Sequence, residues 1–144
     1  MAITRKADAR WQGGLQGGAG RVHLGSGAFE GAYSFNSRFG DGTNGTNPEE
    51  LLGAAHSACF SMALSGALER AGHPATEVAT TAAVTVDREA TGFRITLIHL
   101  TTIAKVPGIS ADDFQKIAAD AKATCPISVA LAATPITLDA TLAQ

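Results

Sequence analysis

The chain has 144 residues, of which 45% are hydrophobic, and its formal net charge is −2. This length suits a single domain, residues 1–144, with a sizeable core. No basic run stands out from the near-neutral charge balance, so we expect no nucleic-acid partner. Charges in the segment MAITRKADARW fall where an export signal needs its apolar centre, which favours a cytoplasmic protein with reduced thiols.

Residues 1–46 are rich in glycine and carry short candidate strands between the glycine turns, a pattern typical of a β-meander. The expected strands are Ala7–Trp11, Arg21–Leu24 and Ala32–Phe35. Gly40–Gly45 also matches the G-x-G-x-x-G spacing of dinucleotide sites, but a polar segment precedes it where such a site follows a buried strand. We therefore expect a turn here and no bound cofactor.

A long helix is expected over Pro48–Ala71. Asn47 is a suitable N-cap, Pro48 suits the first helical position, and Glu50 has the spacing of a capping-box partner. Gly72 supplies the stop. At a rise of 1.5 Å per residue, this helix is about 36 Å long.

The middle of the expected helix, Leu51–Leu68, is apolar on nearly every side and reaches the length of a membrane span. His56 and several serines interrupt it, and small residues dominate, which argues against a membrane. Such a helix must be buried on most faces, and a chain of this size with short strands can scarcely achieve that alone. We therefore expect a second subunit to cover it.

The pattern changes to a period of two after Pro74. Alternate residues over Val78–Val86 share one strand face and those over Phe93–His99 share another, which predicts a hairpin. The remaining expected elements are a helix that Ser110 and Asp113 cap and that runs to Ala123, a short helix from Pro126, and a closing strand over Ile136–Leu142. The fold class is α+β, with antiparallel sheets around a long central buried helix.

The two cysteines have opposite local settings. Cys125 directly precedes Pro126, which suits the first position of a helix, so backbone N–H groups are expected to favour its thiolate. Cys59 lies in the middle of the apolar helix, where desolvation is expected to raise the pKa of its thiol. A reactive Cys59 therefore needs a cation from elsewhere in the protein.

Arg38, just before the long helix, is the best placed cation, and Arg21 is the second candidate. Arg70 lies eleven residues along the same helix from Cys59, about 16 Å away by helical rise, which is too far. Glu49 is about 15 Å from Cys59 by the same rise. If Glu49 and Cys59 act in one site, they must come from two chains.

His56 and Cys59 lie three residues apart on one helix face, and Cys125 offers a third metal ligand. No fourth ligand has suitable spacing, because the other histidines lie in unrelated segments. We therefore expect no metal site. His56 is expected to be a helix-face histidine with a local partner.

Three segments together resemble the OsmC/Ohr family of thiol peroxidases. They are GTNPEELLGAAHSACFSMALS, the later PGI, and CPIS followed by a terminal strand. The resemblance is closest to the OsmC branch and runs from the first expected strand to the last. It implies an OsmC-like intertwined homodimer with two active sites at the subunit interface.

The resemblance implies that Cys59 is the peroxidatic nucleophile and that Cys125 resolves its sulfenic acid to a disulfide. It also implies that Arg38 lowers the pKa of Cys59 and that Glu49 orients Arg38. The implied substrates are hydroperoxides, with organic ones preferred to hydrogen peroxide, and the implied reductant is a dithiol such as a lipoyl group. The implied role is defence against oxidative or osmotic stress.

This chain departs from the Ohr branch, in which the arginine comes from the N-terminal glycine-rich loop. Here that loop reads GGAGR, so Arg21 remains an alternative to Arg38. Glu50 and His56 also stand where Ohr members tend to carry Gln and an aromatic residue. The apolar side chains that can line a substrate pocket, or equally belong to the core, are Phe35, Phe39, Phe60 and Met62.

A second class of function stays open on the residues alone. It is a non-catalytic dimer whose cleft holds an apolar ligand and whose cysteines are incidental. A redox-responsive regulator is a weaker third alternative, because the chain has no basic element for reading DNA.

Overall fold

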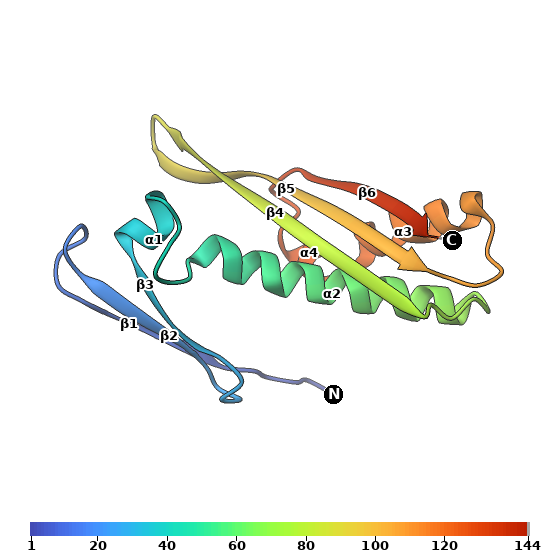
Figure 1. The fold of residues 1–144 in the computed structure, drawn as a ribbon, viewed down its shortest axis with the longest axis horizontal. Helices are drawn as coiled ribbons and strands as arrows, with labels where there is room; N and C mark the ends of the chain where they lie inside the picture. Colours follow the sequence, from blue (N-terminus) through green and yellow to red (C-terminus); the bar gives the residue numbers. More distant parts are fainter. Residues whose placement is uncertain (144) are drawn as a thin grey trace. The chain divides into compact units, whose positions relative to one another are not determined.

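The computed structural model describes residues 1–143 and contains two compact units, Met1–Leu51 and a second unit that begins at Leu52 (Figure 1). Each unit has a three-stranded sheet of its own. The expectation of one domain over residues 1–144 stays a prediction.

The first unit is a β-meander followed by a short helix (Figure 1). Its strands β1 (Ala7–Gln12), β2 (Ala19–Leu24) and β3 (Glu30–Ser34) pair antiparallel in chain order, as the glycine-rich pattern predicts. Helix α1 (Phe35–Phe39) was not expected from the sequence. Its signal is a capping box, in which Ser34 Oγ accepts from the Ser37 amide and Ser37 Oγ from the Ser34 amide.

Helix α2 (Pro48–Arg70) begins and ends where the sequence signals place it. The side chain of Asn47 accepts a hydrogen bond of 2.8 Å from the Glu50 amide, as an N-cap does. Glu50 does not complete a capping box with Asn47, because its carboxylate accepts from the Thr46 hydroxyl instead. At the other end Gly72 has φ of 85°, which a residue without a side chain adopts readily.

The second unit carries the predicted hairpin of β4 (Glu77–Glu89) and β5 (Gly92–Lys105), with β6 (Ile136–Ala143) added beside β5. The β6 strand runs parallel to β5, so the expectation of purely antiparallel sheets is wrong for this pair. The reason is the connection: α3 (Ala111–Thr124) and α4 (Pro126–Ala130) form a helical crossover, which parallel neighbours require.

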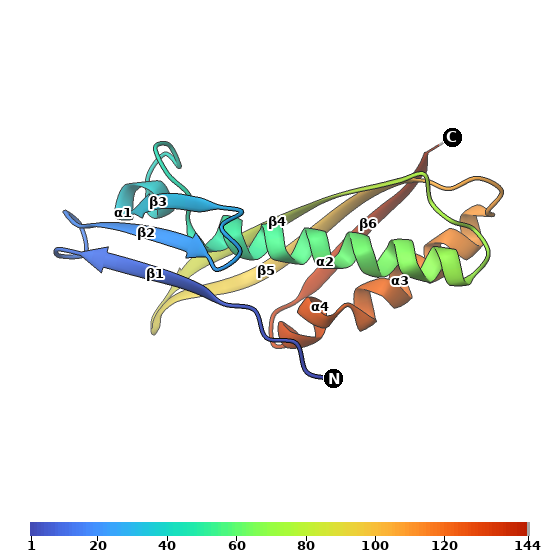
Figure 2. The ribbon, with the colours of Figure 1, turned by 90° about the horizontal axis from the view of Figure 1, so that it is seen from below.

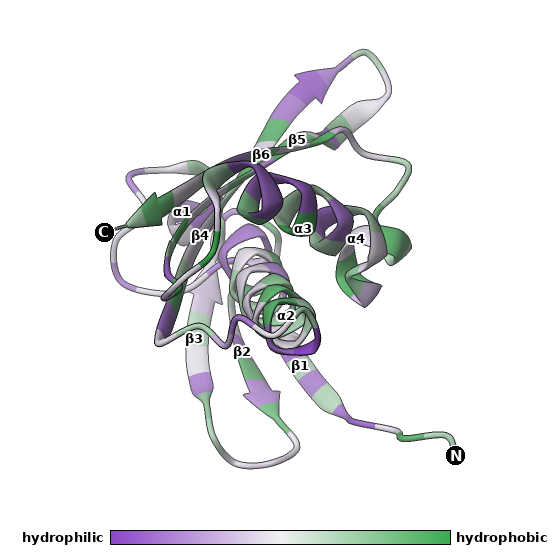
Figure 3. Ribbon diagram, turned by 90° about the vertical axis from the view of Figure 1, so that its right-hand side faces the viewer, coloured by the Kyte–Doolittle hydropathy of each residue, from purple (hydrophilic) through white to green (hydrophobic). Residues whose placement is uncertain are grey.

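Helices α2 and α3 pack on the same face of this sheet, as the views along and across it show (Figure 2, Figure 3). The fully buried side chains of this core include Phe60 and Leu64 of α2, Ile98 and Leu100 of β5, and Phe114 of α3. Both faces of β5 carry apolar side chains, so the alternating pattern in the sequence did not show which face is buried. The even-numbered residues from Ile98 onward point inward, whereas the pattern singled out the odd-numbered ones.

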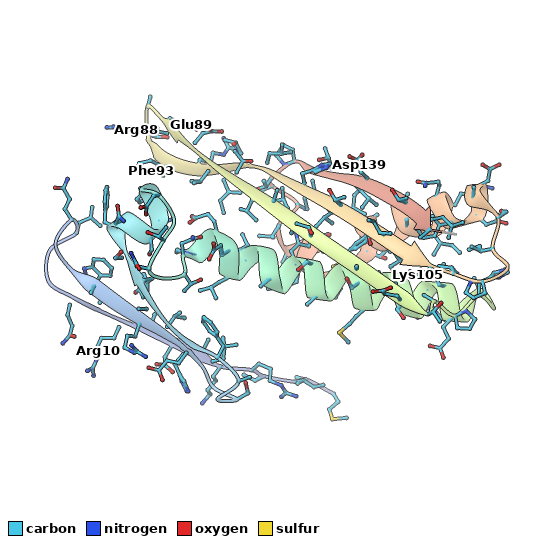
Figure 4. All side chains as sticks on the ribbon, in the orientation of Figure 1. Arg10, Arg88, Glu89, Phe93, Lys105 and Asp139 are labelled. Carbon is cyan, nitrogen blue, oxygen red and sulfur yellow. The ribbon has the colours of Figure 1, made fainter. Side chains whose placement is uncertain are left out.

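The opposite face of the sheet is largely polar and exposed. Asp139 lies on β6, and Lys105 at the end of β5 forms an ion pair of 2.7 Å with Glu77 (Figure 4). Arg88 and Phe93 lie beside the turn between β4 and β5 (Figure 4). This sheet therefore buries one face, with its helices, and leaves the other to solvent.

Part of α2 remains uncovered within the second unit. Ala54, Ala55 and Ala58 are exposed, and Met62 is 77% exposed. Between its charged ends the helix is mostly coloured white and green, the intermediate and hydrophobic colours (Figure 3). It is also long and apolar enough to cross a membrane. Core helices of soluble proteins have the same properties, so this is weak evidence for a membrane. Cover by a second subunit stays a prediction.

Substitution of Phe114 tests this core. Phe114→Ala is expected to lower the free energy of unfolding by about 3–5 kcal/mol, because it leaves a cavity where a fully buried ring stood. Ile103→Ala, on the outer face of β5 where the side chain is 50% exposed, serves as the control and is expected to cost about 1 kcal/mol. Urea denaturation of both variants makes the comparison, and equal losses would contradict the assigned core.

Candidate active site

The two cysteines of the chain meet in the second unit. Cys59 lies in the middle of α2 and Cys125 between α3 and α4, and Cys125 Sγ donates a hydrogen bond of 3.1 Å to Cys59 Sγ. Both thiols are free. Cys125 is fully buried, whereas Cys59 is partly exposed. A small reagent therefore has direct access to Cys59 only.

Local sequence explains why Cys125 lies at a junction between helices. Its amide donates to the Ala121 carbonyl at 2.9 Å and closes α3, while its carbonyl accepts from the Val129 amide at 3.0 Å and opens α4. Pro126 takes the first position of α4, as the Cys-Pro pair predicts. Cys125 is therefore the N-cap residue of α4, although its side chain makes no cap hydrogen bond.

The two thiols have opposite pKa shifts. Burial raises the pKa of Cys59, and the hydrogen bond with Cys125 raises it further. Burial also acts to raise the pKa of Cys125, but hydrogen bonds from the Ser128 amide, from Cys59, from the Ile127 amide and from the Ser128 hydroxyl together lower it. Within the second unit, negative charge is therefore favoured on Cys125 and not on Cys59. This agrees with the expectation that Cys59 needs an imported cation.

The first unit contains an ion pair between Arg38 and Glu49, both singled out from the sequence. Arg38 Nη2 donates to Glu49 Oε1 at 2.7 Å and Arg38 Nε to Oε2 at 3.1 Å, so the carboxylate holds the guanidinium in a bidentate contact. The side chain of Glu49 is 10% exposed and that of Arg38 is 36% exposed. The pair therefore presents a fixed guanidinium with part of its surface available to another group.

An aromatic hollow of about 250 Å³ adjoins this ion pair in the first unit. Its lining residues are Trp11, Leu15, Tyr33, Ser34, Phe35, Arg38, Phe39 and Pro48. The guanidinium carbon of Arg38 lies 4.8 Å from the centre of the Phe39 ring. Of the candidate pocket residues, Phe35 and Phe39 lie here, while Phe60 belongs to the core of the second unit and Met62 is exposed.

The alternative cation, Arg21, lies on β2 in an exposed position. It forms an ion pair of 2.5 Å with Glu30 on the neighbouring strand, and both side chains are at least half exposed. This surface pair differs from the Arg38 pair, whose carboxylate is nearly buried. The geometry of the first unit thus favours Arg38 as the candidate cation.

His56 occupies an unexpected position in the second unit. Its side chain is fully buried, and Nε2 lies 2.8 Å from Ser128 Oγ, so its partner is 72 residues away and not local as expected. Burial lowers the pKa of His56, which is therefore neutral at neutral pH. Within residues 1–143, its Nδ1 atom has no hydrogen-bond partner. The same residues contain no group of three His, Cys, Asp or Glu side chains suited to a metal ion.

Comparisons with known proteins identify the class. The model of the OsmC-like protein family matches residues 40–140. Peroxiredoxin OsmC of Escherichia coli strain K12 is 50% identical over 140 residues, which cover 96% of each chain. Among solved structures, the organic hydroperoxide resistance protein OhrB of Bacillus subtilis has a TM-score of 0.72 and 23% identity, with 98% of each chain covered. An organic hydroperoxide resistance protein from Elizabethkingia anophelis has a TM-score of 0.69 and 26% identity, covering 100% of this chain and 99% of that one.

The chain is a mixed α+β protein with the fold of these solved structures, and it is a thiol-dependent peroxidase. It belongs to the OsmC family and, by its greater identity to the E. coli protein, to the OsmC branch. It reduces hydroperoxides, and the alternative of a non-catalytic binding module is therefore wrong.

The buried histidine predicts a dependence of stability on pH. Because the pKa of His56 is lowered below its ordinary 6.5, the unfolded chain binds a proton as pH falls through 6.5 while the folded chain does not. Acidification should therefore lower the free energy of unfolding, by up to about 1.4 kcal/mol per pH unit for this group.

His56→Gln removes the titration and should make this decline shallower. Urea denaturation of both proteins between about pH 7.5 and pH 5.5 covers the region where the unfolded histidine titrates. Parallel declines in wild type and variant would show that His56 does not titrate differently on folding.

Proposed function

We propose that Cys59 is the peroxidatic nucleophile and Cys125 the resolving thiol. The observation that carries this assignment is the contact of 3.1 Å between a partly exposed sulfur and a fully buried one. A peroxide reaches the partly exposed sulfur of Cys59. The distance from this atom to the buried sulfur of Cys125 exceeds the length of a disulfide bond by only about 1 Å. The reverse order would require the peroxide to enter the core of the second unit.

The reaction proceeds in two steps. The Cys59 thiolate attacks one peroxide oxygen, the O–O bond breaks, and the leaving oxygen takes up a proton to form an alcohol, or water from hydrogen peroxide. Cys59 is then a sulfenic acid. Cys125 attacks its sulfur, the S–S bond forms, the S–O bond breaks, and water leaves. An external dithiol, of lipoyl type, reduces the disulfide and restores both thiols.

Arg38 supplies the positive charge that Cys59 lacks in its own unit. A guanidinium beside the sulfur lowers the thiol pKa and stabilises charge on the leaving oxygen. Glu49 holds the guanidinium through the bidentate contact, which fixes its orientation. Because ten residues of helix separate Glu49 from Cys59, about 15 Å by rise, we assign the Arg38–Glu49 pair of each site to the partner subunit of a homodimer.

The preferred substrates are organic hydroperoxides. Support comes from the aromatic hollow, which offers apolar and aromatic walls directly beside Arg38. In an OsmC-type site the guanidinium would face the peroxide group, and the hollow would receive the apolar remainder of the molecule. The related proteins named for organic hydroperoxide resistance are consistent with this choice. We place the enzyme in the reducing cytoplasm, in defence against oxidative and osmotic stress.

Variants of the two cysteines test the order of the steps. Cys59→Ser is expected to abolish consumption of both hydrogen peroxide and an organic hydroperoxide such as cumene hydroperoxide. Cys125→Ser should leave the first turnover intact, stop multiple turnover with a dithiol, and accumulate a sulfenic acid on Cys59 that dimedone traps.

Mass spectrometry of the oxidised wild type should find one Cys59–Cys125 disulfide. Full activity with both thiols still free would refute the two-cysteine mechanism. Faster turnover of hydrogen peroxide than of the organic substrate would refute the substrate preference while leaving the mechanism in place.

Replacement of Arg38 tests the imported cation. Arg38→Met should slow the reaction of Cys59 with peroxide by about 100-fold at neutral pH, because the thiolate loses its counter-charge. The rate should then keep rising with pH into the alkaline range, since the pKa of Cys59 is no longer held down. Arg21→Met is the matched control and should retain wild-type rates. A reversal of the two results would assign the cation to Arg21.

Mixing inactive variants tests whether the site is shared between subunits. Random heterodimers of Cys59→Ser and Arg38→Met subunits each contain one site with both Cys59 and Arg38, which predicts recovery of about a quarter of wild-type activity. If each site were built from a single chain, mixing would restore nothing.

A further inference from the structure

A second polar contact joins the two segments that carry the cysteines. His56 Nε2 lies 2.8 Å from Ser128 Oγ, and both side chains are buried. His56 precedes Cys59 by three residues on α2, and Ser128 follows Cys125 by three residues in the first turn of α4. Each partner is therefore about one helical turn from a cysteine, so this contact runs beside the contact between the two sulfurs.

A polar side chain anchors the short helix α4 in the core. The helix has five residues, which are too few for a helix to be stable by itself. Among these five, all of which the structure describes, Ser128 is the buried residue, whereas Ile127 is partly buried and Val129 is 58% exposed. The position of α4 against α2 is therefore set in large part by the partner of Ser128.

The surroundings of His56 determine the direction of this hydrogen bond. Burial lowers the pKa of His56, so its imidazole is neutral and carries a single N–H. A proton on Nδ1 would have no acceptor among residues 1–143, a cost that native structures avoid. A proton on Nε2 has Ser128 Oγ as its acceptor. His56 therefore donates to Ser128, and this bond restricts distance and angle more narrowly than an apolar contact does.

We propose that His56 and Ser128 form a clamp that holds Cys125 within reach of Cys59 while Cys59 is a sulfenic acid. Both are positioning residues, because neither exchanges a bond or a proton in the reaction. This inference rests on the proposed roles of the two cysteines and concerns the second step alone.

The contact between the thiols is not sufficient for this purpose. In the reduced protein Cys125 Sγ donates to Cys59 Sγ, and the accepting sulfur is the atom that peroxide oxidises in the proposed mechanism. The hydrogen bond between the sulfurs is therefore altered just when the second step requires them to be close. The clamp contains neither sulfur, so oxidation of Cys59 leaves it intact. It keeps the start of α4 in register with α2 until the disulfide forms.

In the second step the sulfur of Cys125 attacks the sulfur of Cys59. The S–S bond forms and the S–O bond breaks, and the proton of the Cys125 thiol leaves with the hydroxyl group as water. From their separation of 3.1 Å in the reduced protein, the sulfurs need to approach by only about 1 Å. By limiting the motion of Cys125, the clamp raises the effective concentration of one sulfur at the other.

The first measurement separates the two steps in a single turnover. Ser128→Ala and His56→Asn should react with peroxide at the wild-type rate but form the Cys59–Cys125 disulfide about tenfold more slowly, as for loss of one buried hydrogen bond. Dimedone should trap correspondingly more sulfenic acid. His56→Gln is the matched control, because its amide reaches the position of Nε2 whereas that of Asn is one methylene too short. It should restore rapid disulfide formation.

The second measurement determines the effective concentration of the two thiols without peroxide. Wild type and variants are equilibrated with mixtures of reduced and oxidised glutathione, and the fraction with the Cys59–Cys125 disulfide is measured by mass spectrometry. The effective concentration should fall about tenfold in Ser128→Ala and His56→Asn and stay near the wild-type value in His56→Gln.

A core variant distant from the thiols controls for loss of stability. Leu68 is fully buried on α2, nine residues from Cys59 and about 14 Å away by helical rise. Leu68→Ala should lower stability through a cavity but leave the disulfide rate and the effective concentration unchanged. Equal slowing in Leu68→Ala would overturn the clamp, because instability alone would then explain the effect.

Two further results would overturn the clamp while leaving the cysteine roles intact. One is an unchanged disulfide rate in both Ser128→Ala and His56→Asn, and the other is resolution in His56→Gln as slow as in His56→Asn. Absence of a Cys59–Cys125 disulfide in the wild type would instead refute the proposed function. Circular dichroism checks folding, and Ser128→Ala with His56→Gln carries the test if His56→Asn does not fold.

Discussion

The contact between the sulfurs of Cys59 and Cys125 is the constraint on which the second unit depends for its chemistry. It requires α2 and the junction of α3 with α4 to be held against each other, at a distance of 3.1 Å between the sulfurs. The core formed by Phe60, Leu64 and Phe114 against β5 supplies the necessary rigidity. Close packing in such a core tolerates little displacement, so the thiols stay within reach of one another.

The surroundings of the two thiols shift their pKa values in opposite directions. Hydrogen bonding lowers the pKa of the buried Cys125 thiol, whereas burial in an apolar helix raises the pKa of the partly exposed Cys59 thiol. A peroxidatic Cys59 consequently depends on a guanidinium from outside its unit. That dependence ties reactivity to assembly, because a chain without its partner would lack the proposed cation. The uncovered apolar face of α2 is the surface on which such an assembly would be built.

Much of the fold followed from local signals. Proline and asparagine at the start of α2, glycine at its end, and the capping serine of α3 mark their boundaries within a residue or two. The pKa directions of the two cysteines were expected from local sequence, but the contact between the thiols, which are 66 residues apart, contributes to both shifts. Helix α1 was missed because one short turn has no hydrophobic period, and β6 was misjudged because strand direction depends on the crossover before it.

The sequence by itself determined most of the elements, the unequal environments of the two thiols and Arg38 as the candidate cation, because each depends on residues close along the chain. Only the tertiary structure decided that Arg38 and Glu49 form a bidentate pair beside the aromatic hollow, and that His56 contacts Ser128 across 72 residues. Contacts of that kind arise from packing between distant segments, and no period or cap in a single segment records them.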